Sequence, residues 1–136
     1  MVKKMKYAIT NFDHWLTEDE AFERIKLFGI KAGLERNLYL KEEKKFILFF
    51  KKLHKKFSIF FQKNEDLIKI NSKRYLLKEI KKALREKQNL TIKTQSGDLE
   101  IEICDDLILS VKSIFDPKQS PITEIVEASS LFILKA

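Results

Sequence analysis

Residues 90–103 constrain the fold more than any other stretch, because apolar and polar residues alternate on both sides of Ser96-Gly97. Alternation with a period of two is typical of a strand with one buried face, and glycine readily adopts the positive φ angle of a tight turn. The pattern therefore predicts a β-hairpin with a two-residue loop at Ser96-Gly97. A slip of one residue would turn the apolar set into water, so the register is strongly specified. The expected pairs are Leu90 with Ile103, Ile92 with Ile101 and Thr94 with Leu99 on the buried side, and Lys93 with Glu100 and Thr91 with Glu102 on the exposed side.

Further strands are expected on both sides of this hairpin. Residues 46–50 and 57–61 are two runs of consecutive apolar residues, which predict strands that are covered on both faces. Residues 51–56 would form a basic loop between these strands. Together with shorter β-like stretches at 38–40 and 67–70 they predict an antiparallel meander over residues 38–70. Residues 107–114 predict a strand after the hairpin. The sheet would contain about six to seven strands.

Helices are expected at two places and possible at a third. Thr17 and Glu20 form a capping-box pattern that predicts a helix over 17–32, with Gly33 as its C-terminal cap. Apolar residues at helical spacing predict a second helix over 72–87. Residues 122–136 fit either a helix, over about 122–130, or a strand, and it is open whether residues 1–10 join the sheet. The fold class is a single α+β domain spanning residues 1–136.

The order of these elements resembles two known arrangements in topology alone. If residues 7–10 pair with the meander, residues 5–95 resemble the βαββαβ order of ferredoxin-like domains, which include RNA-recognition modules. The same order also resembles that of small secretion-chaperone folds, whose members are typically acidic. Residues 56–61 lack the glycine that RNA-recognition modules carry after the basic residue. The resemblance does not identify a family.

Length and composition limit the classes of protein to which this chain can belong. A chain of 136 residues is long enough to bury a core without disulfides or metals. Its only cysteine, Cys104, cannot form an internal disulfide, and the first residues lack the apolar stretch of a secretory signal, so we expect a cytoplasmic protein. The longest apolar run, residues 46–50, is far shorter than the roughly eighteen residues that a membrane span needs. We therefore expect no membrane association.

Positive charge is concentrated in the middle of the chain. The formal net charge is +7, but residues 41–87 hold sixteen Lys or Arg against six Asp or Glu. Residues 97–136 hold three Lys or Arg against eight Asp or Glu, so the end of the chain is acidic. Clustered cations attract polyanions over a distance, which makes the basic region 41–87 the candidate interface. A solvated, lysine-rich surface without a ligand is the structural alternative.

Two groups of side chains in this region form the candidate site. The first is the basic loop, where lysines and His54 are crowded into residues 51–56. The second is a stripe of cations at helical spacing on one face of the helix 72–87. Both groups predict contact with a nucleic-acid backbone, RNA or DNA, or with an acidic protein surface. The predicted site residues are Lys51, Lys52, His54, Lys55, Lys56, Arg74, Lys78, Lys81 and Arg85.

Other functions have weaker support in the sequence. A protein-interaction module, such as a chaperone, an inhibitor or an immunity-type protein, would use exposed aromatic residues or a strand edge, and a homodimer is possible. A metal-independent ribonuclease would place His54 in its site. Two histidines and one cysteine cannot supply the four ligands of a structural zinc site, and the acidic row of Asp98, Glu100 and Glu102 reads as surface charge. We therefore expect no cofactor and no metal, and favour a non-catalytic role.

Overall fold

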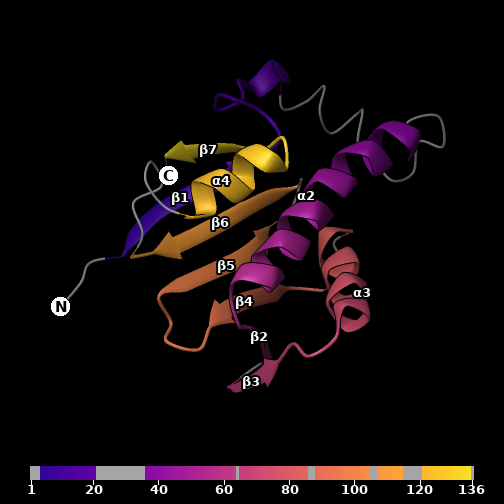
Figure 1. The fold of residues 1–136 in the computed structure, drawn as a ribbon. Coiled ribbons are helices and arrows are strands. Elements are labelled where there is room, and N and C mark those ends of the chain that lie inside the picture. The colour runs from indigo at the N-terminus through magenta and orange to yellow at the C-terminus, as the bar shows by residue number, and fades with distance from the viewer. Residues whose placement is uncertain are drawn as a thin grey trace.

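The computed structural model describes residues 4–20, 36–63, 65–85, 88–104, 107–114 and 121–135, with backbone alone at positions 36, 38 and 63. The strands form one seven-stranded sheet in the order β3-β2-β4-β5-β6-β1-β7, and every neighbouring pair is antiparallel. The helices lie on one face of this sheet (Figure 1), which confirms the α+β class. The strands are β1 (Met5–Thr10), β2 (Ile59–Lys63), β3 (Asp66–Lys69), β4 (Leu90–Thr94), β5 (Leu99–Cys104), β6 (Ile108–Ser113) and β7 (Phe132–Lys135). The helices are α2 (Arg36–Lys56), α3 (Lys73–Leu84) and α4 (Pro121–Ala128).

The hairpin of β4 and β5 has the predicted register, with Leu90 opposite Ile103, Ile92 opposite Ile101 and Lys93 opposite Glu100. Its loop is longer than predicted, because the strands end at Thr94 and begin again at Leu99. The Gly97 N–H donates to the Thr94 carbonyl (3.0 Å), so the turn is centred on residues 95 and 96. Gly97 follows this turn with a φ of +76°, in the left-handed region where an L side chain is strained.

The prediction for residues 38–56 is wrong, because these residues belong to the 21-residue helix α2 and not to two strands and a basic loop. Phe46, Phe49, Phe50 and Leu53 are all fully buried, and their spacing places them on one face of a helix. Residues 36–56 contain neither Gly nor Pro, so nothing in them interrupts a helix. The rest of the predicted meander holds, since β2 and β3 form an antiparallel hairpin.

The structure shows how the segments 5–10 and 121–135 fold. β1 joins the sheet between β6 and β7, so the order differs from the ferredoxin-like one, in which it would lie beside the meander. The C-terminal segment contains both alternatives in turn, first α4 and then β7. Ser130 separates them with a φ of 59°.

The other two predicted helices agree with the structure where it describes them. Residues 18–20 are helical, and Thr17 and Glu20 form the reciprocal capping box: each backbone N–H donates to the other side chain at 3.2 Å. Most of the predicted helix 17–32 lies outside the described residues. α3 begins after Ser72, whose Oγ accepts from the Tyr75 N–H at 3.2 Å.

The core fills the space between the helices and the sheet. Aromatic rings from α2 and β2 occupy its centre, with Phe49 and Phe50 in an edge-to-face contact at 5.1 Å between ring centroids. Within the described ranges, no helix combines the length and the apolar character that crossing a bilayer requires. The burial pattern shows that α2 and α3 each present one face to this core and carry exposed side chains on the opposite face.

Candidate nucleic-acid interface

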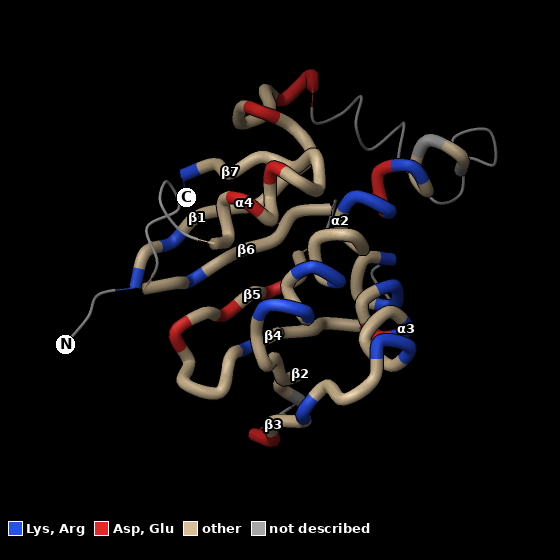
Figure 2. The backbone as a smooth tube through the Cα atoms, viewed as in Figure 1, with Lys and Arg blue, Asp and Glu red and all other residues tan. Residues whose placement is uncertain are grey.

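The predicted site residues lie on two neighbouring helices. Lys51, Lys52, Lys55 and Lys56 occupy the last two turns of α2, so the expected basic loop is a helix end. Arg74, Lys78 and Lys81 are exposed on α3. The two helices pack against each other, and Figure 2 shows their basic segments on the helical side of the sheet. The structure thus brings together two basic groups that are separated in the sequence.

The outer side of α2 carries more cations than the sequence predicted. Lys41, Lys44 and Lys55 are exposed, and Lys51 and Lys52 are partly exposed. The steps from Lys41 to Lys44, from Lys44 to Lys51 and from Lys51 to Lys55 are three, seven and four residues, which aligns these lysines on the side of the helix that faces away from the core. At 1.5 Å per residue the ridge from Lys41 to Lys55 is ~21 Å long. Lys41 and Lys44 are not among the predicted site residues, because residues 38–70 were predicted to form a meander. The helix α2 places them on the same side as Lys51 and Lys55.

The described carboxylates of α2 and α3 are either buried or paired with a neighbouring side chain. Glu43 is 2% exposed and Glu79 is 6% exposed, with the Gln88 side-chain amide donating to Glu79 at 2.6 Å. Glu42 accepts from Lys45 at 2.8 Å and from Asn11 at 3.0 Å. Burial opposes ionisation of Glu42, but these two contacts outweigh it and lower its pKa. Among the described residues, the exposed surface of both helices is therefore basic without an intervening acid.

Arg85 lies in the predicted stripe, but its guanidinium already pairs with the carboxylate of Glu43. Its guanidinium donates from Nε to Oε2 of Glu43 at 2.9 Å and from Nη2 to Oε1 at 2.8 Å. This bidentate contact raises the pKa of Arg85 and joins the end of α3 to α2. The Tyr39 hydroxyl lies in the same cluster and donates to the Leu84 carbonyl at 3.3 Å, and burial raises its pKa. The main role of Arg85 is therefore to link α3 to α2, and its guanidinium is less available to a ligand than the exposed cations of α3.

His54 also has a structural contact. Its Nε2 lies 3.1 Å from the carbonyl oxygen of Ile70, just before α3, and a carbonyl can only accept. Nε2 therefore carries the proton and is not available as a general base. The contact fixes the end of α2 next to the start of α3, which keeps the two basic groups adjacent.

Some cations of the site also have a structural role at the end of α2. His54, Lys55 and Lys56 lie in the last turn of α2, where cations interact favourably with the helix dipole. This accounts for the charges at the helix end. It does not account for Lys41 and Lys44 at the other end of the helix, or for the exposed cations of α3.

The acidic residues of the hairpin lie apart from this surface. Glu100 faces Lys93 on one side and Lys112 on the other, in a row across the sheet face opposite the helices. Within the part of the chain that is described, no three His, Cys, Asp or Glu side chains come together as a metal site requires. Glu100 is therefore surface charge between two lysines, whereas Glu102 lies between Thr91 and Ser110.

The chain was compared with known proteins at three levels. It matches no protein-family model, no curated protein and no solved structure.

Proposed function

We propose that this protein is a non-catalytic binding domain whose α2–α3 surface contacts a nucleic-acid backbone in the cytoplasm. The observation that carries the proposal is the burial of Glu43 and Glu79 together with the pairing of Glu42 to Lys45, which leaves the exposed side chains on the outer side of both helices basic. A surface of one sign attracts a polyanion over a distance and gains affinity by releasing its counterions.

The shape of this surface favours a regular, linear polyanion. The ridge on α2 is ~21 Å long, comparable to about six phosphates along one strand at 3.4 Å each. Its cations are lysines, which bind phosphates as point charges and do not read bases. We therefore expect binding to be salt-sensitive and largely independent of sequence.

A salt titration with matched charge reversals tests this proposal. The affinity for a labelled 20-nucleotide RNA and for the DNA of the same sequence is measured by fluorescence anisotropy at several salt concentrations. The double variant Lys51→Glu/Lys78→Glu should lower affinity and reduce the magnitude of the slope of log K against log salt by roughly 1.4 to 1.8, since each of the two phosphate contacts contributes roughly 0.7 to 0.9. Lys6→Glu/Lys69→Glu makes the same change in net charge at exposed positions on the opposite face of the sheet.

The outcomes separate a local interface from a general effect of charge. The proposal predicts that the control pair changes affinity far less than the helix pair. Equal losses in both variants would show that net charge alone governs binding. Affinity that does not change between about 50 and 300 mM salt would contradict the proposal outright.

One further observation favours a protein-interaction role as a second candidate. β3 is an edge strand on which every residue is exposed, including Leu67 at 50% and Ile68 at 38%. An unpaired strand edge with exposed apolar side chains is a template for pairing with another chain, including a second copy of this one. Pull-down from native lysate with and without nuclease separates the two candidates. A protein partner that survives nuclease and the Lys51→Glu/Lys78→Glu change would favour the β3 edge.

A further inference from the structure

The edge strand β3 has backbone groups that are positioned to bind a further strand. It lies at one end of the sheet, with β2 as its single strand neighbour among the described residues (Figure 1). The Ile70 N–H donates to the Ile59 carbonyl on β2 at 3.1 Å, and the direction of hydrogen bonding alternates along an antiparallel strand. Leu67 and Lys69 therefore direct their backbone N–H and C=O groups towards the free edge.

The charges along this edge complement those of a second, antiparallel copy. Residues 65–69 run from two acids through two apolar residues to a base, and all of them are exposed: Glu65-Asp66-Leu67-Ile68-Lys69. An antiparallel copy places the acidic end of one segment opposite the basic end of the other, whereas a parallel copy would bring like charges together. The charge pattern therefore favours antiparallel self-pairing.

Symmetry narrows the register of such a pair. Two identical antiparallel edges are related by a two-fold axis perpendicular to the sheet, so residues directly opposite each other point to the same face. Leu67, which is 50% exposed, can lie opposite Leu67 of the second copy in a pair with two backbone hydrogen bonds. Glu65, in the turn that leads into β3, then lies beside Lys69 on either side of the leucines. Centring the pair on Ile68 instead would place Leu67 opposite Lys69 and lose both charge pairs.

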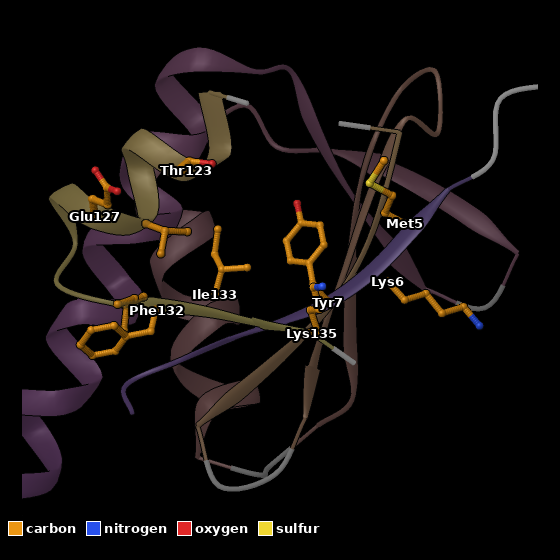
Figure 3. Close-up of a pocket in the computed structure, with 10 residues that line it drawn as sticks. Met5, Lys6, Tyr7, Thr123, Glu127, Phe132, Ile133 and Lys135 are labelled. Carbon is orange, nitrogen blue, oxygen red and sulfur yellow. The ribbon is translucent and has the colours of Figure 1, made fainter. Parts of the chain in front are cut away.

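The other edge strand, β7, is less open to a second copy. Its Ile133 packs against the core and points towards the groove that β7 shares with β1 and α4 (Figure 3). The Trp15 indole N–H donates to the Lys135 carbonyl at 2.7 Å, so another part of the chain already contacts this strand. β3, by contrast, is exposed along its whole length. The edge that suits self-pairing is therefore β3.

We propose that the protein forms a symmetric homodimer in which β3 pairs antiparallel with β3 of a second copy, centred on Leu67 and flanked by two Glu65–Lys69 ion pairs. The two sheets join into one continuous sheet. Because the two-fold axis is perpendicular to the sheet, both α2–α3 surfaces lie on the same side of it. The pairing uses no residue of those surfaces and needs no nucleic acid, so either proposal can fail while the other stands.

Sedimentation velocity of the nuclease-treated full chain tests the dimer over a range from about 10 µM to about 1 mM. The paired segment is short, so we expect a reversible dimer with a Kd on the order of 100 µM. Binding measurements at lower protein concentrations therefore report the monomer. Lys69→Glu and Glu65→Lys each replace two opposite-charge pairs with two like-charge pairs and should weaken the dimer about ten-fold or more.

Mixing these two variants gives the sharpest result. In a heterodimer of Lys69→Glu with Glu65→Lys, both pairs again join an acid to a base. The equimolar mixture should therefore dimerise about as tightly as the unchanged protein, although neither variant does so alone.

Two further variants separate strand pairing from a general effect of charge. Lys6→Glu makes the same charge change on the interior strand β1 and should leave the dimer unchanged. Leu67→Pro removes the N–H that faces the free edge without removing a hydrogen bond to β2, and should abolish the dimer. Circular dichroism melts show whether each variant keeps its fold.

Several results would overturn the proposal. One is a chain that stays monomeric up to about 1 mM. Others are a dimer that survives Leu67→Pro, a dimer that Lys69→Glu and Glu65→Lys leave unchanged, or a mixture of these two variants that pairs no better than either alone. An equal loss in Lys6→Glu would show that net charge, and not the β3 edge, governs association.

Discussion

Arg85 at the end of α3 holds the buried carboxylate of Glu43 on α2 through two hydrogen bonds, at 2.8 and 2.9 Å. Glu43 lies in the middle of the basic sequence, yet its side chain is only 3% exposed. This pairing removes one acid from the solvent-facing side of α2 and fixes α3 against it, so the same contact supports the fold and the electrostatics of the surface.

Arg85→Leu should destabilise the protein by about 2 to 3 kcal/mol, because it leaves the Glu43 carboxylate buried without its partner. The figure is below that of a fully buried pair, since the Arg85 side chain is 35% exposed. Urea denaturation measures the change, and the double variant Glu43→Leu/Arg85→Leu should recover part of the loss. Arg74→Leu, at an exposed position on the same helix, should stay within about 0.5 kcal/mol. Equal costs for Arg85→Leu and Arg74→Leu would contradict this role for Arg85.

The nucleic-acid interface should extend along the whole of α2. Lys41 and Lys44 are exposed on the same side as Lys55. Lys41→Glu/Lys44→Glu should therefore weaken RNA binding to a similar degree as Lys51→Glu/Lys55→Glu, measured by anisotropy at about 100 mM salt. Circular dichroism melts check that both variants remain folded. If the first variant binds like the unchanged protein, the interface is confined to the end of the helix.

Gly97→Ala should cost about 1 to 2 kcal/mol for backbone reasons alone. The left-handed conformation at this position is unfavourable for a residue with a Cβ, whereas no atom lies within 4 Å of where that Cβ would be. Gly97→Asn should cost less, since asparagine tolerates this region better. Thermal unfolding of the two variants gives the comparison. A larger cost for asparagine than for alanine would show that space and not conformation limits this position.

His14 should titrate above its usual pKa. Its two ring nitrogens lie 2.8 Å from Oδ1 of Asp13 and 2.8 Å from Oε2 of Glu20, and these contacts raise the pKa of the imidazole. The contacts therefore favour the folded segment below the usual pKa of about 6.5 and weaken as pH rises through the raised value. NMR titration of the His14 ring gives the pKa, and Glu20→Gln should lower it. An ordinary pKa that Glu20→Gln does not change would contradict the prediction.

The parts of the fold that sequence predicted well depend on local patterns. The β4–β5 register follows from alternation over fourteen residues, and α3 follows from apolar spacing after the Ser72 cap. α2 was misread because the run 46–50 is apolar at consecutive positions, which suits a doubly covered strand as well as a buried helix. The position of β1 depends on pairing with residues 108–135, which no local pattern specifies.

Sequence nominated the residues of the candidate site, but it did not predict how they are arranged. The lysines of residues 51–56 and the α3 stripe were identified from spacing and charge. The inward orientation of Glu43 requires α2 to be a helix, and its pairing with Arg85 joins residues 42 positions apart.

The position of β1 between β6 and β7 has a consequence for how the chain is made. β1 is synthesised well before both of its neighbours, which come from residues 108–135. Its backbone N–H and C=O groups therefore stay without strand partners while the intervening residues are made, and closing so long a loop is slow. The sheet can be completed only after β6 and β7 have followed β4 and β5 out of the ribosome.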